Sequence, residues 1–141
     1  MADRHAHTTP ETDWAGNYIL SSQVWTTSRD LARLALLYQN DGVWHGQRLL
    51  PPGWSRFVAT PAPAQPETVA SGGPGYGGFF WLTGARQGVP DGTYYMNGNR
   101  GQFVFIVPSK RAILVRRGFD PATGPRFDEA RFAREMLAAL D

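Results

Sequence analysis

The amino-acid sequence predicts an α/β domain of the α+β type, in which helices flank an antiparallel sheet. Apolar residues recur at helical spacing over 28–40 and again over 127–140. Between these segments, two apolar runs at 103–107 and 112–115 enclose Pro108-Ser109-Lys110-Arg111, a combination typical of a hairpin. Both runs are apolar at nearly every position, so we expect both faces of these strands to be covered.

The first helix should run from about Ser28 to Asn40. Thr27 offers a hydroxyl that can cap the helix, and Asp30 stands three residues further on, as in a capping box. Gly42 can take the left-handed conformation that often ends a helix. The apolar stripe of this helix comprises Leu31, Leu34, Ala35 and Tyr38.

The remaining elements are expected from their turn residues and apolar stripes. Pro51-Pro52-Gly53 should start a short helix that carries Trp54, Phe57 and Val58. Residues 60–75 are rich in Pro and Gly and predict a loop, which is long enough to suggest a functional or mobile segment. Residues 76–82 fit a strand, and 84–92 a further loop. The closing helix has a stripe made of Phe127, Ala130, Ala133, Met136, Leu137 and Leu140.

Composition bounds what the chain can be. With 141 residues, 42% of them hydrophobic and 13% aromatic, it has enough core-forming side chains for one domain. We expect residues 1–13 to form a loose lead-in and 14–141 to form the domain. The sequence contains no cysteine, which excludes disulfides, thiolate metal sites and a cysteine nucleophile.

Charge and hydropathy argue against two classes of partner. The net charge is only +2 and the arginines are spread along the chain, whereas a nucleic-acid-binding protein needs a concentrated basic face. No run approaches the roughly 20 apolar residues of a membrane span, and the first residues do not resemble a signal peptide. We therefore expect neither a nucleic-acid nor a membrane partner. The compartment, cytoplasmic or periplasmic, stays open.

Several passages resemble, in the same order, those of one family. The first are TTSRDLAR at 26–33, LLYQNDGVW at 36–44, and LLP with GW at 49–54. The later ones are YGGFFWL at 76–82, GNRGQ at 98–102, and VPS at 107–109 with VRRG at 115–118. On these passages, over about 13–140, the chain resembles the β-lactamase-related serine hydrolases, which include class C β-lactamases, penicillin-binding proteins and 6-aminohexanoate-dimer hydrolases.

The resemblance implies a partial β-lactamase/transpeptidase-like fold that lacks the family's N-terminal helix and first strands. It also implies an acyl-enzyme mechanism, in which the serine of a Ser-x-x-Lys pair attacks a carbonyl carbon and two backbone N–H groups hold the oxyanion. The sequence has a single lysine, Lys110, and Val107 stands three residues before it. This chain therefore carries no Ser-x-x-Lys nucleophile.

The resemblance places one site motif in this chain. Anchored on GNRGQ, the family's Lys-Thr-Gly motif falls on Met96, Asn97 and Gly98, and the backbone N–H of Asn99 becomes an oxyanion donor. Gly98 would let a substrate lie against the strand. Met96 replaces a lysine that binds the substrate carboxylate in β-lactamases, which favours an esterase or amidase. The alternative is a plain turn, because Asn-Gly followed by Asn-Arg-Gly is good turn chemistry.

Two tripeptides fit the family's Tyr-x-Asn motif on paper, at 38–40 and at 95–97. Neither stands where the family has this motif, between the nucleophile and the first helix of this chain. Tyr38 also continues an apolar helical stripe. We therefore expect structural roles for both tyrosines.

Asn17 and the histidines are the remaining candidates. Gly16-Asn17 resembles a family "GN" that precedes Ser21-Ser22, and Asn17 would then line the substrate pocket; a role as a local cap or turn residue is equally consistent. The pair His5 and His7 supplies only two ligands in a loose terminus, and His45 fits an exposed turn, so we expect no metal site. No cofactor is expected.

Three functions from different classes follow. The first is the C-terminal fragment of a serine hydrolase for small-molecule amides or esters, which is inactive alone and needs the N-terminal part of the same domain as its partner. The second is a non-catalytic module that keeps the substrate groove and binds without chemistry. The third is a structural or interaction domain that only inherits the likeness.

Overall fold

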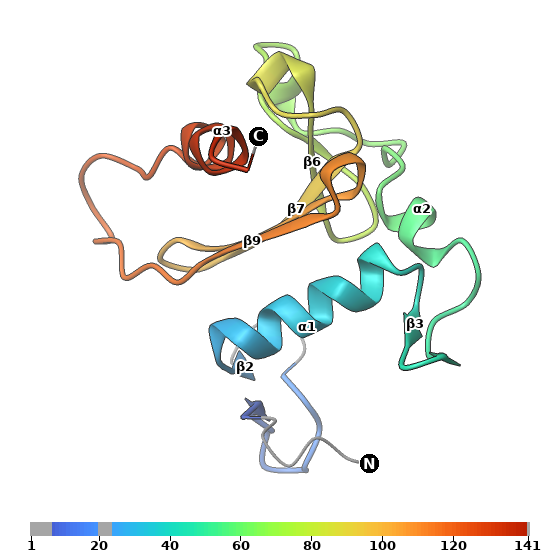
Figure 1. The fold of residues 1–141 in the computed structure, drawn as a ribbon. Coiled ribbons are helices and arrows are strands. Elements are labelled where there is room, and N and C mark those ends of the chain that lie inside the picture. The colour runs from blue at the N-terminus through green and yellow to red at the C-terminus, as the bar shows by residue number, and fades with distance from the viewer. Residues whose placement is uncertain (1–6, 20–23, 141) are drawn as a thin grey trace.

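The computed structural model describes residues 7–19 and 24–140 (Figure 1). Its main sheet is antiparallel, with five strands in the order β5-β6-β7-β8-β9. These strands are Gly75–Tyr76, Trp81–Thr83, Thr93–Gly98, Gln102–Val107 and Ala112–Arg116. The helices are α1 at Ser28–Gln39, α2 at Trp54–Val58 and α3 at Glu129–Ala138. The expected α+β class, an antiparallel sheet flanked by helices, is confirmed.

Helices α1 and α3 cover opposite faces of the sheet (Figure 1). Along β8, Val104 and Ile106 face Ala35 of α1, whereas Phe103, Phe105 and Val107 face α3. This alternation follows from the two-residue period of a strand. The expectation that both faces are covered is confirmed. The β8–β9 hairpin is also confirmed, with a short 3-10 turn at Pro108–Lys110 between the strands.

Helix α1 begins and ends at or next to the residues that the sequence indicated. Thr27 caps the helix by accepting a hydrogen bond from Asp30 N at 3.1 Å, and its hydroxyl donates to the Asp30 carboxylate at 2.9 Å. After the helix, Gly42 adopts a φ of +80° and its N–H donates to Leu37 O at 2.7 Å. A Cβ at Gly42 would lie 2.5 Å from Leu50 Cβ, so this position requires glycine.

Asp41 connects α1 to α2. Its carboxylate accepts hydrogen bonds from Gly53 N at 3.0 Å and from Ser55 N at 3.4 Å, at the start of α2. These donors, Gly53 first, lower the pKa of Asp41. Between the two helices, the turn expected at His45 closes a small hairpin of β3 (Val43–Trp44) and β4 (Gln47–Arg48).

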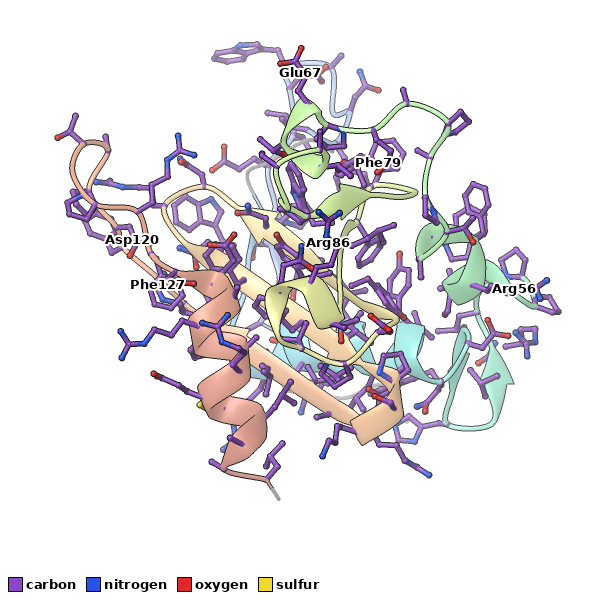
Figure 2. All side chains as sticks on the ribbon, turned by 90° about the horizontal axis from the view of Figure 1, so that it is seen from above. Arg56, Glu67, Phe79, Arg86, Asp120 and Phe127 are labelled. Atoms are coloured by element: carbon purple, nitrogen blue, oxygen red, sulfur yellow. The ribbon has the colours of Figure 1, made fainter. Side chains whose placement is uncertain are left out.

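The prediction of one strand over 76–82 is wrong, because these residues form a hairpin. Strand β5 pairs with β6 in the register Tyr76↔Trp81, and the chain reverses between them. Gly77 makes this reversal possible, since a Cβ there would lie 2.2 Å from Val58 O of α2. Phe79 sits on the reversal with φ +66° and an exposed ring (Figure 2). The aromatic run resembled a strand, and its reversal depends on the distant contact with α2.

The closing helix is shorter than its apolar stripe suggested. It begins after Asp128, whose carboxylate accepts a hydrogen bond from Arg131 N at 2.8 Å, so Phe127 lies outside the helix. Ala133 and Leu137 are buried against the sheet, whereas Met136 and Leu140 are exposed. The stripe is therefore only partly a core face.

The N-terminal segment contains a second small sheet, which the sequence did not indicate. Strand β1 (Thr9–Pro10) pairs with β2 (Val24–Trp25), and the Trp25 indole donates to the Glu11 carboxylate at 2.6 Å. Residues 7–13, part of the expected lead-in, are thus bonded to later segments. The domain boundary at 13 and 14 stays a prediction, and residues 1–6 lie outside the described part.

Candidate functional site

The residues expected at the Lys-Thr-Gly position form the last half of β7. Met96, Asn97 and Gly98 pair with Val104, Phe103 and Gln102 of β8. On its other side, β7 pairs with β6 only over Thr93–Tyr95. Among the described strands, none pairs with Met96–Gly98 on that side. This half-strand therefore presents an open edge, with backbone groups free of a strand partner.

The side chains of this half-strand differ in their surroundings. Met96 is half-buried and packs on the core beneath α1. Asn97 and Gly98 are exposed. Because neighbouring side chains of a strand alternate between faces, Asn97 points to the face opposite Met96. The open edge is thus flanked by an apolar group and an amide, without a charge from the strand itself.

Asn99 lies just beyond the strand, in the turn that joins β7 to β8. Arg100 and Gly101 in this turn have φ values of +60° and +82°. The strand ends at Gly98, and the turn occupies 99–101, so Gly98 belongs to the strand and Asn99 to the turn. The oxyanion role of the Asn99 N–H, and substrate binding by Met96, Asn97 and Gly98, stay predictions.

The end of β9 and the segment after it bind this turn. The Arg116 guanidinium donates to Gly101 O at 2.7 Å, and Asp120 N donates to Arg100 O at 3.1 Å. Next to them, the Gln102 side-chain amide donates to Gly118 O. None of these contacts was expected from the sequence. Arg116 and Gly118 stood in the VRRG passage, and that passage was the available signal.

Asn17 belongs to a local turn. Its N–H donates to Asp13 Oδ1 at 2.9 Å, and its side-chain amide donates to Asp13 Oδ2 at 3.1 Å. The Asn17 side chain is the main cause of the lowered pKa of Asp13. None of the hydrogen bonds recorded for the described residues links Asn17 to β7. These contacts favour the turn alternative, and its role in a pocket stays a prediction; Ser21 and Ser22 lie outside the described residues.

The tyrosines of both Tyr-x-Asn tripeptides pack in the core. The Tyr38 ring lies 4.9 Å from that of Phe80. Tyr95 is 2% exposed and stacks on Phe105 with the ring centroids 4.7 Å apart. Burial raises the pKa of the Tyr95 hydroxyl above its ordinary value. Structural roles fit both.

Within 7–19 and 24–140, no cluster of three or more His, Cys, Asp or Glu side chains is arranged to hold a metal ion. His7 and His45 belong to this part of the chain, whereas His5 lies outside it. Over the same residues, no helix is long and apolar enough to cross a membrane.

Comparison with known proteins shows a likeness of fold. No protein-family model and no curated protein matches the sequence. Among solved structures, the chain is similar to one described as "Putative 6-aminohexanoate-dimer hydrolase from Bacillus anthracis", with a TM-score of 0.65 and 20% sequence identity. The match covers 93% of this chain and 32% of that one. The chain thus spans about a third of that protein's length, and its fold is consistent with part of a β-lactamase-like fold.

Proposed function

We propose that this chain forms the oxyanion side of a serine-hydrolase site that acts on a small-molecule amide or ester through an acyl-enzyme. The observation that carries the proposal is the open edge of β7 over Met96–Gly98. A substrate that lies along this edge would bring its carbonyl to the Asn99 N–H, the proposed oxyanion donor, which follows the last residue of the strand. The similar fold of the putative 6-aminohexanoate-dimer hydrolase supports the same assignment.

The side chains at this edge bear on the substrate class. Met96 offers no cation for a substrate carboxylate, so the site favours amides or esters without a negative charge at that position. Gly98 has no side chain to obstruct a ligand that lies along the strand. Together with the exposed amide of Asn97, these features fit esterase or amidase chemistry better than β-lactam recognition.

The nucleophile must come from elsewhere, since the only lysine, Lys110, does not follow a serine by three residues. We infer that an N-terminal part of the same domain supplies the Ser-x-x-Lys pair, and that this chain alone is inactive. Strand β9 pairs only with β8 among the described strands, so its outer edge can receive the strands of that part.

The test compares the chain alone with the chain joined to the segment encoded in frame before Met1. Each protein is treated with a fluorophosphonate probe and with a nitrophenyl ester, and adducts are located by mass spectrometry. We expect one adduct on a serine of the added segment, with ester hydrolysis, and none on the chain alone. An adduct on a serine of the chain alone would contradict the proposal, as would a joined protein that folds but neither reacts nor hydrolyses.

The same open edge also favours a second function, a non-catalytic binding module. An extended peptide can add to a strand edge through main-chain hydrogen bonds, with no nucleophile. The upstream DNA separates the two: a Ser-x-x-Lys in frame supports the hydrolase, and a stop codon with a promoter supports the binding module.

A further inference from the structure

The β7–β8 turn is bound to one ion pair through its backbone. Arg116 donates to the carboxylate of Asp120 with both terminal nitrogens, at 3.0 and 2.6 Å. One of these nitrogens also donates to Gly101 O at 2.7 Å. Asp120 holds the adjacent peptide, because its N–H donates to Arg100 O and its own carbonyl accepts from Arg100 Nε, each at 3.1 Å.

Two glycines leave the space that the ion pair occupies. A Cβ at Gly101 would lie 2.0 Å from Asp120 Oδ2 and 2.1 Å from a terminal nitrogen of Arg116. A Cβ at Gly118 would lie 2.1 Å from the same nitrogen and 2.5 Å from Gly101 O. Any other residue at either position would displace the pair or the turn. The contact of the Arg116–Asp120 pair with the turn therefore requires glycine at both positions.

The Arg116 guanidinium also stacks on an aromatic ring. The guanidinium carbon lies 3.6 Å from the centroid of the Phe127 ring, and Phe127 packs on Phe103 and Phe132 at the edge of the core. Figure 2 shows Asp120 and Phe127 together beside the first turn of α3. The side chains of Arg116 and Asp120 are only 20% and 25% exposed. A planar fork that is stacked, paired and part-buried has little freedom to turn.

We propose that Arg116 and Asp120 are positioning residues of the candidate site. They fix the carbonyls of Arg100 and Gly101 and so hold the turn at 99–101. The Asn99 N–H belongs to the Gly98–Asn99 peptide, where this turn begins. The proposal rests on the proposed function for the role of Asn99, but the effect on the turn is a property of this chain alone. Without the pair, the turn would sample several directions, and the Asn99 N–H would no longer be preorganised toward a carbonyl oxygen.

The test measures backbone order in the whole 141-residue chain by ¹⁵N relaxation. Arg116→Lys keeps the charge but loses the planar fork. We expect the order parameters of the Asn99, Arg100 and Gly101 amides to fall from about 0.85, typical of rigid backbone, to below about 0.6. Those of Phe105 and Ile106 in β8 should stay unchanged. A general loss of stability would not produce this local pattern.

The matched control is Arg131→Lys, since Arg131 forms another i,i+4 pair, with Glu135, whose side chains are 67% and 64% exposed. It should leave the turn rigid. Asp120→Asn gives a second variant in case Arg116→Lys does not fold, and we expect a smaller fall at Gly101 because Asp120 N still holds Arg100 O. A turn that stays rigid in every folded variant, or an equal fall in β8, would overturn the proposal.

A second readout separates this proposal from the proposed function. In a joined, active protein, Arg116→Lys should lower kcat more than it changes KM, because the turn acts on the transition state rather than on substrate binding. If Arg116→Lys makes the turn mobile but the joined protein is not acylated, the positioning role of Arg116 is supported. The result then contradicts only the proposed hydrolase function.

Discussion

The substitution Gly101→Ala tests whether the β7–β8 turn is built around the ion pair, and Gly92→Ala is its matched control. Gly101 and Gly92 have φ values of +82° and +78°, so a side chain is strained at both. A Cβ at Gly92 would meet nothing within 4 Å, whereas one at Gly101 would lie 2.0 Å from Asp120 Oδ2. The difference between the two variants therefore isolates the crowding against the ion pair.

The magnitudes follow from these two contributions. The left-handed conformation costs an alanine about 1–2 kcal/mol at either position. At Gly101 the displaced arginine also loses a charge-assisted hydrogen bond, a further loss of about 1.5–3 kcal/mol. We expect Gly92→Ala to lower the free energy of unfolding by about 1–2 kcal/mol and Gly101→Ala by about 2.5–5 kcal/mol.

Urea unfolding followed by tryptophan fluorescence measures both losses, with equal m-values as the condition for comparing them. If the two variants lose the same free energy of unfolding, a Cβ at Gly101 does not disturb the ion pair of Arg116 and Asp120. The turn would then not be built around the ion pair.

Two further predictions concern the helix ends. The lowered pKa of Asp41 means that its carboxylate stabilises the fold above the ordinary value of 3.8 and that this contribution disappears as the pH falls through the lowered value. Asp41→Asn should therefore flatten the dependence of unfolding free energy on pH around and below the ordinary value of 3.8, and an unchanged dependence would contradict the assignment. Thr27→Ala should cost about 1 kcal/mol of unfolding free energy through loss of the α1 cap, whereas Thr27→Ser should keep most of it. Equal losses in these two variants, measured in urea, would show that the hydroxyl does not cap the helix.

The elements that sequence reasoning predicted are those whose signals are local. Helix α1 has its cap, its stripe and its terminating glycine within 27–42. The β8–β9 hairpin has both apolar strands around a proline turn. The hairpin of β5 and β6 was missed, because its reversal requires Gly77 to pack against Val58 O, nineteen positions earlier in the chain.

The site was predictable only in part, for the same reason. The position of Met96–Gly98 on a strand came from the resemblance. The open edge depends on where β6 stops pairing, and no local pattern fixes that point. The contact between Arg116 and Gly101 O joins residues 15 positions apart and needs glycine at two separate places. Such a contact becomes visible only when the turn and the end of β9 are placed together.

The most direct test of the central claim compares Asn99→Pro with Asn99→Ala in the chain joined to its N-terminal part. Proline removes the backbone N–H, whereas alanine removes only the side chain. Loss of one oxyanion donor should lower kcat by a factor of about a hundred or more in Asn99→Pro and leave Asn99→Ala close to the unsubstituted protein. An unchanged melting temperature and unchanged substrate binding in Asn99→Pro exclude distortion of the turn and of the strand before it. With both controls met, equal kcat in the two variants would remove the Asn99 N–H from the site and contradict the account.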